Sequence, residues 1–569
     1  MKIRNIIMAG FCAVALTSCN FLDFDETNGG NSEEDLYALF GTIKQMLTNV
    51  YSSMPSYTGF TSATADGLAM RDCASDDAEY GITNATIQNV NNGTWSATNT
   101  YDDAWTLYNG IRAANNFIKN FETVDLSRFS SLANYENQMK QMQYYPYEAR
   151  VLRAYYFFEL ARRYGDIAMP LTVLTTLEAN TIAQTPFDEV IKFIVAECSE
   201  CAPNLPLTYT NVPQSEIGRV TQGFALAVKT KALLYAASPL HNPSDDAEKW
   251  KAAARAAKEV MDLGVYSLEP AYINNTNSKE LILARMNAAA QPYELYNFPY
   301  RFTYGVRTTA LIASGNYPTQ NLVDAFETTG GYKVTLGSNG WQSDDPAFDP
   351  AHPYDNRDPR FARTILADGM AFKGSVIESF VGGADDRAVS LGGSATGYFV
   401  RKYLQENANF DPTQTGAAAY MHHWVLYRYA ETLLTYAEAM VNAFGSGTYT
   451  DGEFPVSALD ALNQVRANAS MPEIASGSKD ELLGRIRNEW RVEFAFEDHR
   501  FWDVRRWKLD PATTQTSIYG VQIVRNDSGT KSYYRRLVET RTWRDAMYLY
   551  PIPQPELFKN TNLVQNTGW

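Results

Sequence analysis

The chain has 569 residues, of which 45% are hydrophobic and 20% are charged, a composition typical of folded globular proteins and unlike that of disordered ones. At about 150 residues per domain, this length would allow three or four domains, and it is enough to bury a large core. The formal net charge is −15 and no run of basic residues occurs. Nucleic acid is therefore excluded as an expected partner, because a phosphate backbone requires a basic stripe.

Residues 1–18 have the pattern of a secretory leader. Lys2 and Arg4 supply positive charge, and residues 6–16 form an apolar run too short to cross a bilayer as a helix. The run leads into Leu-Thr-Ser-Cys at 16–19, which resembles the lipobox of bacterial lipoproteins and predicts lipidation of Cys19. Two or more acyl chains, at ~0.8 kcal/mol per buried CH₂, anchor a protein stably. The alternative is a cleaved leader followed by an incidental cysteine.

After Cys19 the sequence contains no apolar run of transmembrane length, so we expect a protein that is anchored to a membrane and does not span it. The acidic residues Asp23, Asp25 and Glu26 resemble the signals that send lipoproteins to the cell surface in Bacteroidetes.

The expected helical segments come next along the chain. They have apolar residues at helical spacing and end at glycine or proline signals. The segments are 146–164, 220–237, 246–263, 425–442, 456–467 and 479–502. Consecutive amphipathic helices with small residues on their faces predict a mostly α-helical fold in which tetratricopeptide-like helix pairs form a scaffold.

Two stretches lack helical periodicity. Residues 51–100 and 264–420 are rich in Gly, Asn, Asp, Ser or Pro, and are too long to be simple connectors. We interpret them as functional loops, with a few short β-hairpins, carried by the scaffold. Because helical segments flank the longer stretch on both sides, residues 19–569 are predicted to form a single domain with two loop insertions.

Chemistry-bearing motifs are few. Cys198-x-x-Cys201 has the spacing of redox or zinc motifs, but there is no second cysteine pair, and the five histidines do not form an HExxH motif. We interpret the two cysteines as small packing residues near a helix end, and leave open whether a disulfide joins them. No GxSxG, Walker or GxGxxG motif occurs. We expect no catalytic residues, no cofactor and no metal.

Six blocks in a constant order carry a resemblance to a known family. The blocks are Trp105 to Asn115, Glu148 to Asp166, Gly218 to Thr221, Arg428 to Ala439, Ile486 to Trp507 and Tyr550 to Trp569. Together with the lipobox, they resemble the SusD/RagB family of Bacteroidetes nutrient-binding lipoproteins. Two positions depart from the family's usual residues: Trp490 stands in place of an Arg, and Thr567 in place of a Pro.

The resemblance implies a tetratricopeptide-like scaffold with ligand loops above it. It also implies an outer-membrane location facing outward and a partner, a TonB-dependent SusC-like transporter. The implied function is to bind an extracellular nutrient, an oligo- or polysaccharide, and deliver it to that transporter. The family also includes peptide binders, which is the alternative.

A charged segment near the C-terminus invites a catalytic interpretation. Its carboxylates recur every four residues at Glu489, Glu493 and Glu497, with Arg485, Arg500 and Arg505 within reach. Paired carboxylates can hydrolyse glycosides, but they must then flank a cleft at a defined separation. Carboxylates interleaved with arginines along one helix are better explained as ion pairs between helices. We assign the same structural role to Glu148, Arg150 and Arg153.

Ligand-binding candidates come from the loop segments. A sugar has apolar C–H faces and a rim of hydroxyls, so its site needs aromatic platforms and polar side chains. The candidates are Trp95, Trp341, Tyr80, Tyr304, Tyr317, Asp66 and Arg71. Packing within its own loop is the alternative for each aromatic. A glycan hydrolase or a purely adhesive surface protein are further functional alternatives, and no motif supports either.

Overall fold

A computed structural model describes residues 36–55, 68–102, 104–208 and 216–569. Two predicted site residues, Cys19 and Asp66, lie outside these ranges. Among the described residues, no helix is both long and apolar enough to cross a membrane.

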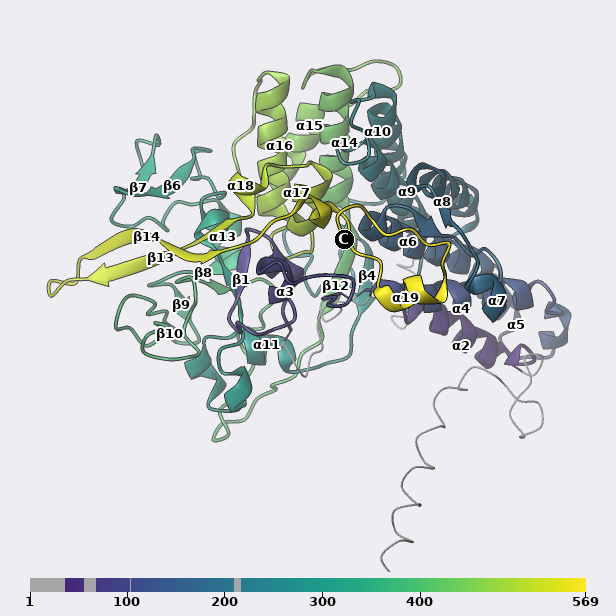
Figure 1. The fold of residues 1–569 in the computed structure, drawn as a ribbon, viewed down its shortest axis with the longest axis horizontal. Helices are drawn as coiled ribbons and strands as arrows, with labels where there is room; N and C mark the ends of the chain where they lie inside the picture. Colours follow the sequence, from purple (N-terminus) through teal and green to yellow (C-terminus); the bar gives the residue numbers. More distant parts are fainter. Residues whose placement is uncertain (1–35, 56–67, 103, 209–215) are drawn as a thin grey trace, which may run out of the picture.

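Long helices form one side of the molecule and its top in Figure 1. They are α2 (Phe40–Tyr51), α4 (Leu107–Phe121), α6 (Tyr145–Tyr164), α8 (Phe187–Cys201), α9 (Gln222–Ala237), α10 (Ala247–Asp262), α14 (Tyr429–Phe444), α15 (Ala458–Asn468) and α16 (Lys479–Glu493). Each packs on the next in a continuous series: α2 on α4, α4 on α6, α6 on α8, α8 on α9, α9 on α10, α10 on α14, and α14 on both α15 and α16. Because neighbours in sequence pair in this way, the series is tetratricopeptide-like.

Side-chain caps fix where several of these helices begin. Thr221 accepts a hydrogen bond from the backbone N–H of Phe224 at the start of α9, and Asp246 caps α10. Ser457 and Ser478 form reciprocal capping boxes at the starts of α15 and α16. Each cap contributes about 1 kcal/mol, because it satisfies a backbone N–H that has no partner within the helix.

The helix predicted over 425–442 begins later than the sequence indicated. Residues His423–Arg428 form strand β12, antiparallel to β4 (Leu281–Met286), and α14 follows at Tyr429. The guanidinium of Arg428 is buried at the end of β12 and donates to Glu280 and Glu497. Contacts with distant residues therefore hold this segment extended.

The helix predicted over 479–502 is interrupted. Helix α16 ends at Glu493 and α17 (Arg500–Arg506) begins seven residues later, with positive φ at Phe496 (60°) and Asp498 (63°). The φ values end the helix, because L-residues in a right-handed helix have negative φ. The backbone N–H of Phe496 donates to Asp72 at 3.1 Å, so a contact with the N-terminal third fixes the break.

Short elements fill the remainder, mainly in the loop-rich half of the molecule. The short helices are α3 (Gln88–Asn91), α5 (Tyr135–Met142), α7 (Thr176–Ala179), α11 (Pro292–Asn297), α12 (Gln320–Val323), α13 (Pro359–Thr364), α18 (Pro511–Thr514) and α19 (Gln554–Lys559). Besides β4–β12, the antiparallel strand pairs are β1 (Ala78–Tyr80) with β5 (Asn316–Pro318), β2 (Ile167–Ala168) with β3 (Gln184–Thr185), β6 (Val334–Gly337) with β7 (Gly340–Ser343), β8 (Ile365–Leu366) with β11 (Phe399–Val400), β9 (Ala371–Phe372) with β10 (Ser375–Val376), and β13 (Ser517–Arg525) with β14 (Lys531–Thr540).

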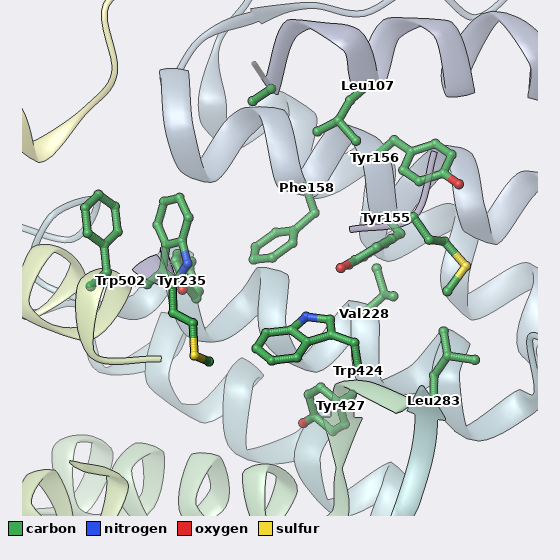
Figure 2. Close-up of a cluster of buried hydrophobic side chains, with 14 of the residues drawn as sticks. Leu107, Tyr155, Tyr156, Phe158, Val228, Tyr235, Leu283, Trp424, Tyr427 and Trp502 are labelled. Atoms are coloured by element: carbon green, nitrogen blue, oxygen red, sulfur yellow. The ribbon is translucent and has the colours of Figure 1, made fainter. Parts of the chain in front are cut away.

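The main core joins the helical scaffold to strands β4 and β12. Phe158 of α6 packs edge-to-face on Tyr235 of α9 with their ring centroids 5.1 Å apart, and Trp424 and Tyr427 of β12 lie in the same cluster (Figure 2). Burial of Trp424 and Tyr427 in the same apolar cluster as the helix side chains holds β12 on the helices. The loop-rich half has its own smaller core, made by Phe298, Phe302, Tyr317, Leu366, Phe372, Ile377, Phe399, Ala408 and Phe410.

Candidate functional site

The carboxylates of the C-terminal signature are fully engaged in ion pairs. Glu489 accepts from Arg360 at 2.5 Å and from Arg466 at 2.9 Å, and Glu493 accepts from Arg360 at 2.8 Å and from Arg428 at 2.7 Å. All of these side chains are buried. The prediction that these carboxylates tie structural elements together is confirmed, although their partners are not the arginines at 485, 500 and 505.

The surrounding charges set the protonation of Glu493. Burial alone would raise its pKa, but Arg428 and Arg360 lower the pKa to about 2. A carboxylate that is ionised at neutral pH and paired with two arginines has neither the proton nor the open position that acid catalysis requires. The arrangement is therefore a structural clamp.

The same holds for the ion pairs predicted within the scaffold. Arg150 of α6 donates to Glu197 of α8 at 2.6 Å, and Arg153 donates to the same carboxylate at 3.0 Å. Glu148 is buried and accepts from Arg219, which follows α8 in the chain. The predicted pairing between helices is confirmed for Arg150 and Arg153, whereas Glu148 pairs with an arginine in the segment that precedes α9.

Trp95 and Arg71 lie in the protein interior. The Trp95 ring is 1% exposed and meets Tyr101, Tyr550 and Trp569 edge-on, with ring centroids 4.9 to 5.2 Å away. The prediction that Trp95 is a loop platform for a sugar is wrong, because these neighbours cover its ring. Arg71 is equally buried and donates to the hydroxyl of Tyr550, so Trp95 and Arg71 share Tyr550 as a neighbour inside the protein and neither forms part of a binding surface.

Trp341 is also covered. It lies on β7, 5% exposed, with the rings of Tyr354 and Tyr533 packed edge-on against it and the guanidinium carbon of Arg357 5.7 Å from its ring centroid. Its ring therefore offers no free face, and the prediction of a ligand platform at Trp341 is wrong as well. Its indole N–H has no hydrogen-bond partner among the described residues.

Tyr80 and Tyr317 lie on the paired strands β1 and β5. Tyr80 is opposite Asn316 and Glu79 is opposite Tyr317, and both tyrosines are at most 2% exposed. The Tyr317 hydroxyl donates to the backbone carbonyl of Ser314 at 3.2 Å. Since neither phenol reaches solvent, a direct ligand contact is not available to them. They form the floor beneath the loop that carries Tyr304.

Tyr304 is the one predicted aromatic that the structure exposes, with 50% of its surface accessible. It follows the 3₁₀ turn Tyr300–Thr303 and has left-handed backbone angles, φ 49° and ψ 35°. Non-glycine residues seldom adopt these angles, and such strained positions cluster at functional sites. Its hydroxyl makes no hydrogen bond to any residue in the described part of the chain.

A buried arginine holds the Tyr304 loop. Arg307 donates to the backbone carbonyls of Leu295, Phe298, Ile312 and Ser314 at 2.6 to 3.0 Å. Burial lowers the pKa of Arg307, and the phenols of Tyr317 and Tyr80 oppose this shift, which places those two rings close to the guanidinium. The loop that presents Tyr304 is therefore preorganised on the β1–β5 floor.

A second loop segment lies against this one. Arg301 donates to both carboxylate oxygens of Asp385 at 3.0 Å and to the hydroxyl of Ser375 at 3.2 Å. Gly392 approaches Tyr300 so closely that an added Cβ would lie 2.2 Å from the Tyr300 Cβ. Segments 300–306 and 375–392 thus form one continuous surface.

We call this surface the Tyr304 face. Its exposed apolar side chains are Tyr304, Val306, Val376, Val381, Val389 and Leu391, each between 46% and 69% exposed. The valines and Leu391 were not predicted from the sequence. The sequence signal for these residues was the presence of apolar side chains within glycine-rich segments such as 389–393. Such segments have no helical or strand periodicity that would predict burial of those side chains.

The cysteine pair has no ligand-binding arrangement. Cys198 and Cys201 are buried on α8 as free thiols, and burial raises the pKa of Cys201 to about 12. The prediction of packing residues near a helix end is confirmed, and the pair is not joined by a disulfide. Within the described ranges, no group of three or more His, Cys, Asp or Glu side chains is placed to hold a metal ion.

Comparisons with known proteins establish the family. Residues 279–569 match the SusD family model, so the chain belongs to the SusD family. The curated SusD-like protein P2 of Formosa agariphila is 24% identical over 583 aligned positions, which cover 98% of each chain. Family membership confirms the resemblance seen in the sequence blocks.

Solved structures show the same fold. A SusD-like protein from Bacteroides fragilis has 26% identity and a TM-score of 0.75, covering 95% of this chain and 99% of that one. A second protein from the same species, described as a SusD-like carbohydrate binding protein, has 25% identity and a TM-score of 0.71, covering 93% and 100%. The predicted mostly helical, tetratricopeptide-like fold with long loops and short strand pairs is confirmed.

Proposed function

We propose that this protein captures an extracellular glycan at the Tyr304 face. The observation that carries the proposal is the exposed ring of Tyr304 on a loop that a buried arginine holds in place, in a chain of the SusD family. An exposed phenol offers an apolar face to the C–H side of a sugar ring, and its free hydroxyl can form hydrogen bonds with the hydroxyls of the sugar. A relative that is described as carbohydrate binding supports the same ligand class.

The proposal includes a place for the protein in the cell. Residues 1–18 act as the leader, Cys19 carries the lipid, and residues 19–569 form a single domain displayed on the outer surface of the outer membrane. The captured glycan passes to a TonB-dependent SusC-like transporter. Binding without turnover agrees with the carboxylates of the signature, which are committed to ion pairs.

Calorimetry on a panel of soluble glycans and peptides tests the proposal. The protein without residues 1–19 is compared with Tyr304→Ala and with Tyr332→Ala, a control tyrosine of similar exposure at 44% that lies outside the Tyr304 face. We expect one glycan class to bind saturably without product release. Affinity should fall at least tenfold in Tyr304→Ala, as it does when a central aromatic contact is removed, and should be unchanged in Tyr332→Ala.

The other outcomes are equally informative. If only peptides bind, and Tyr304→Ala weakens them, the face is a peptide site and the glycan assignment is wrong. If a glycan binds equally to all three proteins, the site lies elsewhere. Co-purification with a TonB-dependent barrel from the same cells tests the transporter partner separately.

A further inference from the structure

A groove of about 220 Å³ lies between α4, residues 168–182 with α7, and the C-terminal α19. Figure 1 places α4, α7 and α19 together on one side of the molecule, while β10, which carries Val376 of the Tyr304 face, lies on the other. The groove is therefore remote from the site described above.

The sequence builds one wall from a single helical face. Trp105 lies in the 3₁₀ turn Ala104–Thr106 that leads into α4, and Tyr108, Arg112 and Asn115 follow at intervals of three, four and three residues. This spacing stacks the four side chains along one side of the helix. All four line the groove.

Two asparagines fix the walls in place. The amide of Asn115 donates to the carbonyls of Pro170 and Thr172, each at 3.0 Å. From the opposite side, the amide of Asn560 donates to the carbonyl of Ile182 at 2.8 Å. Because both clamps are present without any ligand, the groove is preformed, and a ligand need not supply the free energy to order it.

The floor of the groove is aromatic. The half-buried Trp105 ring packs on Tyr108, with centroids 5.0 Å apart, and edge-on against Tyr164 at 5.3 Å. The hydroxyl of Tyr108 already donates to the carbonyl of Ala168 at 2.9 Å, so this side chain contributes its ring and not its polar tip. A rigid aromatic floor of this kind suits the apolar face of a single sugar ring.

The rim carries a cation that has no partner. Arg112 is exposed, and its guanidinium makes no hydrogen bond or ion pair with any residue in the described ranges. Lys559 also lines the rim and is paired with Glu556 at 2.8 Å, so the rim carries one net positive charge in a chain whose net charge is −15. A free guanidinium is suited to bidentate binding of a carboxylate.

We propose that this groove is a second saccharide site, which takes one carboxylate-bearing sugar ring of the uronic acid type. The ring lies on Trp105 and its carboxylate meets Arg112. The volume lies below the range of about 300–1,000 Å³ for sites of drug-sized ligands, which agrees with a single ring. The proposal rests on the saccharide-binding role proposed above and adds a site that selects for charge.

Saturation-transfer NMR with glucuronate, and with glucose as the neutral counterpart, tests the site on the protein lacking residues 1–19. We compare Arg112→Gln with Arg128→Gln, which removes the same charge at an exposed arginine outside the groove. Ala179→Trp fills the groove from the end of α7. Glucuronate should bind saturably and more tightly than glucose. Its affinity should fall about tenfold or more in Arg112→Gln and in Ala179→Trp, and stay unchanged in Arg128→Gln.

The proposal is overturned if glucuronate does not bind, or if Arg112→Gln and Ala179→Trp bind it like the wild type. Tyr304→Ala separates the two sites. Loss of glucuronate binding in that variant would place the acidic sugar on the Tyr304 face and overturn the second site. If the glycan panel fails at the Tyr304 face while glucuronate still depends on Arg112, only the first proposal falls.

Discussion

The Nε of Arg71 lies 2.7 Å from the carboxylate of Asp498, although 427 positions separate the two residues in the chain. Arg71 also donates to Asp102 at 2.7 Å, and Arg163 donates to the same Asp102 oxygen at 3.0 Å. Burial alone would raise the pKa of Asp102, but Arg163 and Arg71 hold it well below its usual value. The cluster joins the N-terminal loops, helix α6 and the break between α16 and α17.

Arg71→Gln should lower the free energy of unfolding by about 3–5 kcal/mol, because it removes the guanidinium that donates to Asp498 and one of the two that neutralise the buried Asp102. Urea unfolding followed by circular dichroism measures this change. Arg128→Gln, at an exposed arginine, should change stability by less than about 0.5 kcal/mol. A loss in Arg71→Gln no larger than in this control would contradict the structural role.

Trp95→Ala should also destabilise the protein by about 3–5 kcal/mol, the usual cost of removing a buried Trp or Phe side chain. The cause is the cavity left among Tyr101, Tyr550 and Trp569. Thermal and urea unfolding of Trp95→Ala and Tyr304→Ala provide the comparison. Because Tyr304 is half-exposed, Tyr304→Ala should lower the free energy of unfolding by much less. Equal stability of the two variants would show that Trp95 is not a core residue.

Stability should fall as the pH is lowered through the range in which Glu493 titrates. Its folded pKa, about 2, is below the ordinary value of 4.5, so its contribution is complete above pH 4.5 and is lost as the pH falls toward 2. At about 1.4 kcal/mol per unit of pKa, this lowering of the Glu493 pKa corresponds to a contribution of roughly 3 kcal/mol to the free energy of unfolding. The free energy of unfolding, measured with urea, should differ less between pH 7 and pH 3 for Glu493→Gln than for the wild type. An identical pH dependence would rule out this assignment.

Arg307→Lys should loosen the loop that presents Tyr304 and leave the scaffold intact. A lysine ammonium cannot reach the four carbonyls that the guanidinium bridges, and leaving buried carbonyls without donors is costly. Hydrogen exchange should accelerate at residues 295–314 and stay unchanged in α9 and α10. Glycan affinity at the Tyr304 face should drop in parallel. Uniform acceleration in all segments would indicate global destabilisation instead.

Cys19→Ala should release the protein from the membrane. Without the thiol no lipid can be attached, and the remaining chain has no helix suited to span a bilayer among its described residues. Cell fractionation and detergent partitioning of wild type and Cys19→Ala measure the change, with Cys73→Ala as the matched cysteine control. Retention of Cys19→Ala in the outer-membrane fraction would contradict the anchor.

Much of the scaffold could be predicted from local patterns. The apolar spacing over 146–164 corresponds to α6 at Tyr145–Tyr164, and the segments over 220–237 and 246–263 correspond to α9 and α10 within two residues at each end. Periodicity and caps act over a few residues, so they can be read without knowing the fold. The signature blocks also indicated the family correctly.

The exposure of the loop aromatics could not be predicted in this way. Trp95 and Tyr304 both stand in loops, yet Trp95 is covered by Tyr550 and Trp569 from the far end of the chain. Tyr304 is half-exposed, on a loop that Arg307 anchors through backbone carbonyls. Whether a loop side chain is buried depends on which distant segment of the chain packs against it, and the local sequence pattern does not indicate that segment.

The sequence by itself determined helices α6, α9 and α10, the ion-pairing role of the carboxylates and the family, because each of these depends on residue type and short-range spacing. Tertiary structure decided where helices stop, as at Phe496, and it decided that α10 packs on α14 although residues 263–428 lie between them. It also decided which side chains face solvent. The physical reason is that these features depend on contacts between residues that are hundreds of positions apart, which only the folded chain brings together.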